Sequence, residues 1–315
     1  MHKLIGLIIS MALAGSALAQ DAAMVSREET DAQFRALLAA TALMDYEKVT
    51  FQLRSPISLV QVSALEADSE GNLYILHRNL ELDPVIVADP QGNILRSFGQ
   101  GLNVWPHGIR IDGNGDVWTV DSTSSVVLKF SPQGDLLLRI EVGDLVDPGR
   151  QSCAASDIAF GLNGHLYVSD GYCNSRVVEY DASGNKVRQW GGPGNGPGEF
   201  NLLHAIAVSP TGNVYVADRE NGRVQWFDAI GNYLGHWYFG GRILSLDFTD
   251  DGELFVGGEP KGAPPMMEGS LIKVNPQTGE MLGRFPGFAH ALSVSPDGDL
   301  LAGSLTEAIT LYRQR

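Results

Sequence analysis

One pattern recurs six times along the chain: a short apolar strand, a tight turn containing glycine, and a second apolar strand. The segments IRIDGNGDVWTVD and IAVSPTGNVYVAD are two clear copies. The glycines of the six turns follow one another at intervals of 40 to 49 residues and are Gly71, Gly115, Gly164, Gly212, Gly252 and Gly298. A unit repeated at this interval buries its apolar faces by stacking on its neighbours. The chain is therefore predicted to be a repeat protein built from strands.

Two further strands follow the first pair in most units, as in SVVLKF and DLLLRIEV after the second turn. Four strands within about 40 to 50 residues are typical of one blade of a β-propeller. Six such units predict an all-β, six-bladed β-propeller, in which each blade covers the apolar face of the next. The 37 glycines of the chain fit the many tight turns that such a fold needs.

The two ends of the chain are predicted to complete one blade together. The sixth unit has only three strands, and the segment KVTFQL, residues 48–53, can supply the fourth. Pairing these segments would close the ring and remove two exposed sheet edges. We therefore expect the propeller to span residues 48–315. Residues 20–47 form a lead-in, of which residues 28–45 have the pattern of an amphipathic helix packed on the outside.

The first 19 residues have the features of a secretory signal peptide: Lys3, an apolar run over residues 4–13, and Ala17 and Ala19 at the cleavage site. We expect export to the periplasm or the extracellular medium. No later segment is long and apolar enough to cross a membrane. With 37 acidic and 22 basic side chains, the net charge of −15 would repel nucleic acids and anionic lipids. We expect a monomer that binds neither.

Three histidines occupy the same position in alternate units. The residue eight places before each turn glycine heads the innermost strand, and it is His107, His204 and His290 in units two, four and six. Innermost strands line the channel of a propeller, so the three imidazoles should converge on its axis. Three neutral imidazoles with open positions beside them are typical of a catalytic zinc site. The alternative is that they only bind ordered water in the channel.

Loops between the second and third strands should surround the same end of the channel, because strand direction alternates within a blade. An arginine there can bind a carboxylate through two hydrogen bonds, and a tyrosine whose pKa is lowered by a metal and a guanidinium can act as a base. We expect Tyr172 and Arg78 to be catalytic. The predicted substrate-binding residues in these loops are Arg219, Arg223 and Asn174.

Two features of these loops suggest structural roles. Arg176 and Arg223 recur at one position of the repeat, which favours an ion pair between blades over a role in the site. The only cysteines of the chain, Cys153 and Cys173, belong to one unit. In an exported protein such a pair indicates a disulfide, which would fix the loop of Tyr172.

An aspartate at the end of the second strand, followed by Asn-x-Arg, resembles the NHL repeat, most clearly in DGYCNSRVVEY and DRENGRVQWF. Units one and five depart from it, with His77 and Gly258 in place of the aspartate. Longer segments, including PHGIRID, SDGYCNSR, VADRENGR and AHALSVS, resemble the peptidyl-α-hydroxyglycine α-amidating lyase family in order and spacing. This resemblance covers nearly all of residues 60–300, and SDGYCNSR and VADRENGR are its most specific parts.

The resemblance implies a propeller enzyme that cleaves a peptidyl α-hydroxyglycine to a peptide amide and glyoxylate. It implies that Zn²⁺ is bound by His107, His204 and His290. It also implies that Tyr172 takes the hydroxyl proton of the substrate, and that Arg78 lowers the pKa of this tyrosine and binds the oxyanion or carboxylate. The expected substrate is a small peptide, or another N-acyl group, that ends in α-hydroxyglycine.

The sequence departs from this family beside the third histidine. The family has an aspartate there that helps to hold a structural calcium, whereas this chain has Ala291, so calcium is not expected. Phe288 and Ala289 replace the family's Met-Pro, so the fit of substrate near His290 should differ. The cysteines, in contrast, match a disulfide of the family.

Two other functions fit the same repeat. A non-catalytic NHL propeller would bind a protein or peptide across its face and would need no stoichiometric metal. A metal-dependent hydrolase of the lactonase type would use carboxylates and asparagines in the channel. None of these occupies the six positions that head the inner strands, which are Ser63, His107, Ser156, His204, Leu244 and His290.

Overall fold

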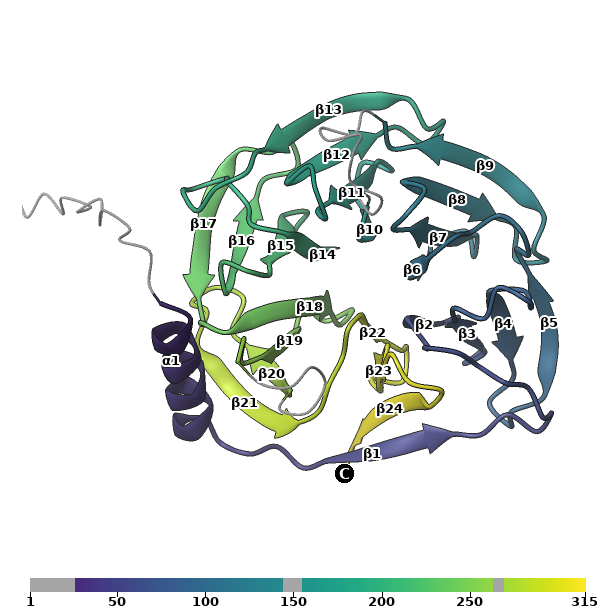
Figure 1. Cartoon of the computed structure of the whole chain (residues 1–315), viewed down its shortest axis with the longest axis horizontal. Helices are drawn as coiled ribbons and strands as arrows, with labels where there is room; N and C mark the ends of the chain where they lie inside the picture. Colours follow the sequence, from purple (N-terminus) through teal and green to yellow (C-terminus); the bar gives the residue numbers. More distant parts are fainter. Residues whose placement is uncertain (1–25, 144–154, 263–268) are drawn as a thin grey trace, which may run out of the picture.

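The computed structural model describes residues 26–143, 155–262 and 269–315. Within these ranges, 24 strands form six antiparallel sheets of four strands each. The sheets are arranged as blades around a central axis and follow the chain around the ring (Figure 1). The predicted all-β, six-bladed propeller is confirmed.

In each blade the first strand lies nearest the axis and the fourth lies at the rim (Figure 1). Blades one and two contain β2 (Ala64–Ala67), β3 (Leu73–Leu76), β4 (Val85–Ala88), β5 (Ile94–Phe98), β6 (Pro106–Ile111), β7 (Val117–Asp121), β8 (Val126–Phe130) and β9 (Leu136–Glu141). Blades three and four contain β10 (Asp157–Phe160), β11 (Leu166–Asp170), β12 (Arg176–Tyr180), β13 (Lys186–Gly191), β14 (Leu203–Val208), β15 (Val214–Asp218), β16 (Arg223–Phe227) and β17 (Tyr233–Tyr238). Blades five and six contain β18 (Arg242–Phe248), β19 (Leu254–Glu259), β20 (Ser270–Val274), β21 (Met281–Pro286), β22 (Leu292–Val294), β23 (Leu300–Ala302), β24 (Ile309–Gln314) and β1 (Tyr46–Phe51).

The strand β1 closes the ring. It pairs antiparallel with β24, with Tyr46 opposite Gln314 and Phe51 opposite Ile309. Both ends of the chain therefore contribute to one sheet, as the strand count predicts. The closing strand lies two residues earlier than the expected segment, residues 48–53. Its pairing covers an edge of β24 that would otherwise be open.

The apolar core lies between neighbouring blades. For example, Tyr167 and Val177 of blade three pack with Ile206 and Phe227 of blade four, and all four are buried. The six turn glycines all have positive φ, between 77° and 91°. Glycine adopts this region without the steric penalty of other residues. These turns set the register of the first two strands of each blade, and so the place of the residue that heads the inner strand.

The lead-in contains one helix, α1 (Arg27–Ala40), which lies against the rim of the ring beside β21 (Figure 1). Ser26 caps the helix in a reciprocal capping box with Glu29. The helix ends where Thr41 becomes extended, so it is shorter than the amphipathic segment of residues 28–45. From there the chain runs directly into β1.

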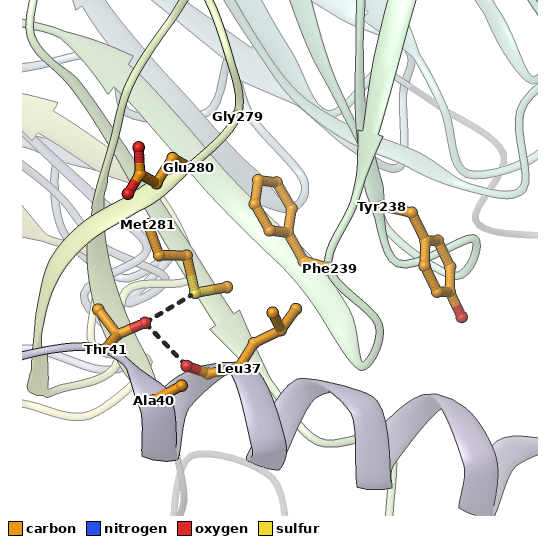
Figure 2. Close-up of a pocket in the computed structure, with 8 residues that line it drawn as sticks. All are labelled: Leu37, Ala40, Thr41, Tyr238, Phe239, Gly279, Glu280 and Met281. Carbon is orange, nitrogen blue, oxygen red and sulfur yellow. Dashed lines mark hydrogen bonds between the residues drawn. The ribbon is translucent and has the colours of Figure 1, made fainter.

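The helix is anchored in blade five by Phe34, which is fully buried. A Cβ placed on Gly258 would come within 2.9 Å of the Phe34 ring, and one on Gly241 within 3.1 Å. Gly258 stands where the repeat has aspartate, so this departure in the fifth unit makes room for α1. A pocket near the C-terminal end of the helix is lined in part by Leu37 and Met281 (Figure 2), and it contains none of the predicted site residues.

Two predictions fall on residues that the structure does not describe. The signal peptide, residues 1–19, and Cys153 both lie outside the described ranges. Export and the disulfide to Cys173 therefore stay predictions. Among the described residues, no helix combines the length and apolar character needed to span a membrane.

Candidate metal centre

Three histidine side chains meet at the centre of the ring. His107 belongs to β6, His204 to β14, and His290 lies two residues before β22. Their ring centroids are 4.6 to 5.1 Å apart, and one nitrogen of each ring lies within 4.8 Å of the others. All three residues are buried, with at most 8% of their surface exposed. Imidazoles from alternate blades are thus brought to one point.

An irregularity at the head of the inner strands places two of these side chains. In β6 the register shifts between Pro106 and Gly108, so His107 has no residue opposite it. His204 is bypassed in the same way in β14, and Leu244 is bypassed in β18. Such a bulge bends the strand and re-aims the extra side chain. The bulge therefore occurs whether or not a histidine is present. Histidine occupies the bulged position in β6 and β14, and leucine occupies it in β18.

A backbone carbonyl of another blade fixes the orientation of two of the rings. Nδ1 of His107 lies 2.6 Å from the carbonyl oxygen of Ser156, and Nδ1 of His204 lies 2.7 Å from that of Leu244. A carbonyl can only accept, so Nδ1 carries the proton in both rings and Nε2 keeps its lone pair. Histidines that bind metals commonly donate their other N–H to a carbonyl in this way.

The electrostatics of the cluster favour neutral imidazoles. Burial holds the pKa of His107, His204 and His290 well below its usual value, and the neighbouring rings, Arg78 and Arg219 lower it further. Neutral imidazole is the form that binds metal ions. The donor set of three close, neutral nitrogens therefore fits a metal ion.

The phenol of Tyr172 lies against two of the imidazoles. Its Oη is 2.6 Å from Nε2 of His107 and 3.1 Å from Nε2 of His204. Because Nδ1 holds the proton in both rings, both Nε2 atoms are acceptors, and the single phenol proton is donated to the nearer one, Nε2 of His107. Burial raises the pKa of Tyr172, while the charges of Arg219 and Arg78 lower it. Burial outweighs the two guanidinium groups, so the lowered pKa expected from the sequence depends on the charge of a bound metal.

The guanidinium group of Arg78 is held at the edge of the site. Its Nε donates to the carbonyl of Pro106 at 3.0 Å, and Nη1 donates to Oε1 of Gln61 at 3.2 Å. Its Cζ lies 4.5 Å from the centre of the Trp105 ring, which is within the range of a cation–π contact. Burial lowers the pKa of Arg78 to about 10, so the group stays charged at neutral pH.

Comparison with known proteins shows which sequences the chain resembles. Residues 200–227 match the NHL repeat. A *Caenorhabditis elegans* protein named as a peptidyl-α-hydroxyglycine α-amidating lyase is 28% identical over 302 residues, which cover 84% of this chain and 86% of that protein. The mouse peptidyl-glycine α-amidating monooxygenase is 32% identical over 289 residues, covering 77% of this chain and 29% of the mouse protein. The chain is a homologue of the peptidyl-α-hydroxyglycine α-amidating lyases.

This lyase homologue thus spans less than a third of the length of the mouse relative. Among solved structures, a streptogramin B lyase matches it with a TM-score of 0.61, covering 88% of this chain and all of the other. The two sequences are 13% identical, so this match shows a shared propeller fold alone.

Two predicted substrate-binding residues make hydrogen bonds within the scaffold. Nε of Arg223 donates to Asp218 at 2.7 Å, and its other nitrogens donate to three carbonyls of the loop at residues 195–199. Asn174 donates to Asp170 at 2.7 Å. These contacts involve all three guanidinium nitrogens of Arg223. Both residues thus have partners within the scaffold, and their role in substrate binding stays a prediction.

The channel also holds a second charged layer, which was not predicted from the sequence. Arg110 is buried and donates to Oδ2 of Asp157 at 2.9 Å, and its Nη1 lies 3.8 Å from Oε2 of Glu66. The charge of Asp247 also acts on Arg110. A signal existed, because Glu66, Arg110 and Asp247 stand three residues after the heads of their inner strands.

Proposed function

We propose that this chain is a zinc-dependent lyase that cleaves the C–N bond of a peptidyl, or other N-acyl, α-hydroxyglycine to give an amide and glyoxylate. The observation that carries the proposal is the convergence of His107, His204 and His290 with the phenol of Tyr172. Relatives named as amidating enzymes support the reaction class. The set of three neutral imidazoles supports zinc as the metal.

In the proposed reaction one proton leaves the substrate hydroxyl and one proton reaches the departing nitrogen. Oη of Tyr172, as the phenolate, takes the hydroxyl proton and passes it to the departing nitrogen, because it lies beside His107 and His204 at the centre of the site. The electron pair of the C–N bond passes to the amide nitrogen, which is protonated as the C=O bond of glyoxylate forms. No water is consumed. Zinc, when bound, would polarise the hydroxyl oxygen.

Two arginines are proposed to hold the carboxylate of the substrate. Arg78 donates to the carbonyl of Pro106, next to His107. The backbone of Arg219 donates to that of Leu202, two residues before His204. Both arginines therefore belong to the surroundings of the metal centre. A guanidinium can bind a carboxylate through two parallel hydrogen bonds. Fixing this end of the substrate would orient its hydroxyl toward Tyr172.

Other parts of the proposal concern the protein rather than the reaction. We propose that the chain is exported by residues 1–19, acts as a monomer, and contains a disulfide between Cys153 and Cys173. We propose no structural calcium, because Ala291 offers no side-chain ligand and packs against the apolar cluster of blades one and two.

The test uses zinc-loaded protein and a synthetic peptide that ends in α-hydroxyglycine, with glyoxylate and the peptide amide both measured. We expect equal amounts of the two products. His107→Ala should bind zinc at least ~10-fold more weakly and lose most of the activity. His236→Gln is the matched control, because His236 pairs with Gln225 in the outer sheet. Loaded protein that releases no glyoxylate above background would exclude the proposed reaction.

A further inference from the structure

We propose that the N-terminal helix α1 positions Arg219 at the metal centre, with Asp31 as the positioning residue. Asp31 would act on Arg219 through two groups in turn. The first is residues 261–262 of the loop after β19, and the second is Glu220. The proposal rests on the proposed function where it concerns turnover, because Arg219 is there taken to bind the substrate carboxylate. It gives a role to a segment for which the sequence suggests none.

The first link joins α1 to the loop. Oδ1 of Asp31 accepts a hydrogen bond from the backbone N–H of Lys261, and Oδ2 accepts one from that of Gly262, both at 2.6 Å. Arg27 donates to the carbonyl of Lys261. Hydrogen bonds to a carboxylate are stronger than those between neutral groups. Asp31 therefore fixes the loop to the helix through two consecutive peptide units.

The helix can fix the loop because it is itself fixed to the ring. Phe34, one turn after Asp31, is fully buried against blade five. The backbone N–H of Gly241 donates to the carbonyl of Thr30 at 3.2 Å. Asp31 lies between these two anchor points and is itself buried. Its carboxylate is therefore held at a set place relative to blades four and five.

The second link joins the loop to the residue beside Arg219. Nζ of Lys261 donates to the backbone carbonyl of Glu220. Oε1 of Glu220 lies 3.1 Å from Nε of Arg219 and 3.0 Å from Nε of Arg242. Glu220 thus binds the loop through its backbone carbonyl and forms ion pairs with two arginines through its carboxylate.

The third link joins Arg219 to the metal centre. Its backbone N–H donates to the carbonyl of Leu202 at 3.2 Å, two residues before His204. Its carbonyl accepts a hydrogen bond from the backbone N–H of Ile243 at 3.4 Å, and the carbonyl of the next residue, Leu244, orients the ring of His204. A displacement of the loop would therefore move or free a cation in the surroundings of the metal centre.

The first experiment measures the accessibility of Arg219 without any substrate. Arginine side chains are modified with phenylglyoxal, and the rates at Arg219 and Arg78 are read from peptide masses. Asp31→Asn leaves one loop N–H without its acceptor, and we expect it to raise the ratio of the Arg219 rate to the Arg78 rate several-fold. Glu28→Gln is the matched control, because it removes the same charge from an exposed position of the same helix. An unchanged ratio would overturn the proposal, whether or not the protein is an active lyase.

The second experiment measures turnover of the α-hydroxyglycine peptide. Asp31→Asn should lower kcat/KM about three- to tenfold, mainly through KM, because a displaced guanidinium binds the carboxylate less well. The effect should vanish in an Arg219→Lys background and persist in an Arg78→Lys background. Equal effects in both backgrounds would contradict positioning through Arg219. Absence of turnover in the wild type would refute the proposed function instead, and the labelling ratio would still decide the inference.

Discussion

The hydroxyl of Tyr172 is the single atom on which the proposed chemistry depends most. Tyr172→Phe removes it while leaving the three imidazoles in place, so zinc content should not change. We expect kcat to fall by about 10²- to 10⁴-fold, the usual loss when a positioned acid or base is removed. Steady-state release of glyoxylate, with the metal content of each sample measured, checks this.

A matched control for this change is Tyr233→Phe. The hydroxyl of Tyr233 contacts His236 in the outer strand of blade four, away from the proposed site residues. Its loss should leave kcat within about twofold of the wild type, as is common for surface changes. If Tyr172→Phe behaves like this control, Tyr172 is not the group that takes the hydroxyl proton.

The site residues show what a sequence can and cannot predict at this scale. His107, His204 and His290 could be found because a turn glycine fixes their distance along each blade. The bulge that aims two of them could not, because it adds no periodic signal and depends on the pairing of backbone groups. The same holds for the raised pKa of Tyr172, since burial depends on the whole surroundings of the ring.

Among the elements, α1 buries one aromatic side chain, that of Phe34, completely against the ring. Phe34→Ala would leave a cavity over Gly258 and Gly241, and we expect it to lower the free energy of unfolding by about 3 to 5 kcal/mol. Urea unfolding followed by tryptophan fluorescence measures this. Gln33→Ala, an exposed change on the same helix, should have an effect within about 0.5 kcal/mol. Equal stability of the two variants would mean that Phe34 does not hold the helix.

Counting strands in the sequence predicts some elements of the fold but not others. The closing strand β1 was predictable, because a sixth blade with three strands leaves an edge that must be covered. The docking of α1 was not, although Gly258 broke the repeat at the place where the helix binds. A departure from a repeat shows that something differs there, but only the packing shows that an aromatic ring fills the space.

At the scale of the whole molecule, the channel holds two layers of polar side chains that join different blades. The histidines form one layer, and three residues further along the inner strands Arg110 lies among the carboxylates of Glu66, Asp157 and Asp247. One guanidinium thus faces three acids drawn from blades one, three and five. This excess of buried acid should make the stability of the ring depend on pH.

Above pH 6, the titration of Glu66 determines whether the free energy of unfolding rises or falls with pH. Burial, opposed in part by Arg110 and aided by Asp247 and Asp157, raises the pKa of Glu66 from 4.5 to about 8. The same cause raises the pKa of Asp247 only to about 6. Between pH 6 and 8 the folded protein therefore keeps a proton on Glu66 that the unfolded chain has released. The free energy of unfolding must then fall as pH rises, by up to about 1.4 kcal/mol per pH unit.

Glu66→Gln removes this titration and keeps the shape of the side chain. From pH 6 to pH 8 the wild type should lose about 2 to 3 kcal/mol more stability than the variant, and the two curves should become parallel only above about pH 9, where Glu66 is ionised in both states. Glu70→Gln, at an exposed position of the same blade, should follow the wild type. Denaturant unfolding at four pH values separates these outcomes. Parallel curves for the wild type and Glu66→Gln between pH 6 and 8 would show that Glu66 is already ionised in the folded ring, with Arg110 outweighing its burial.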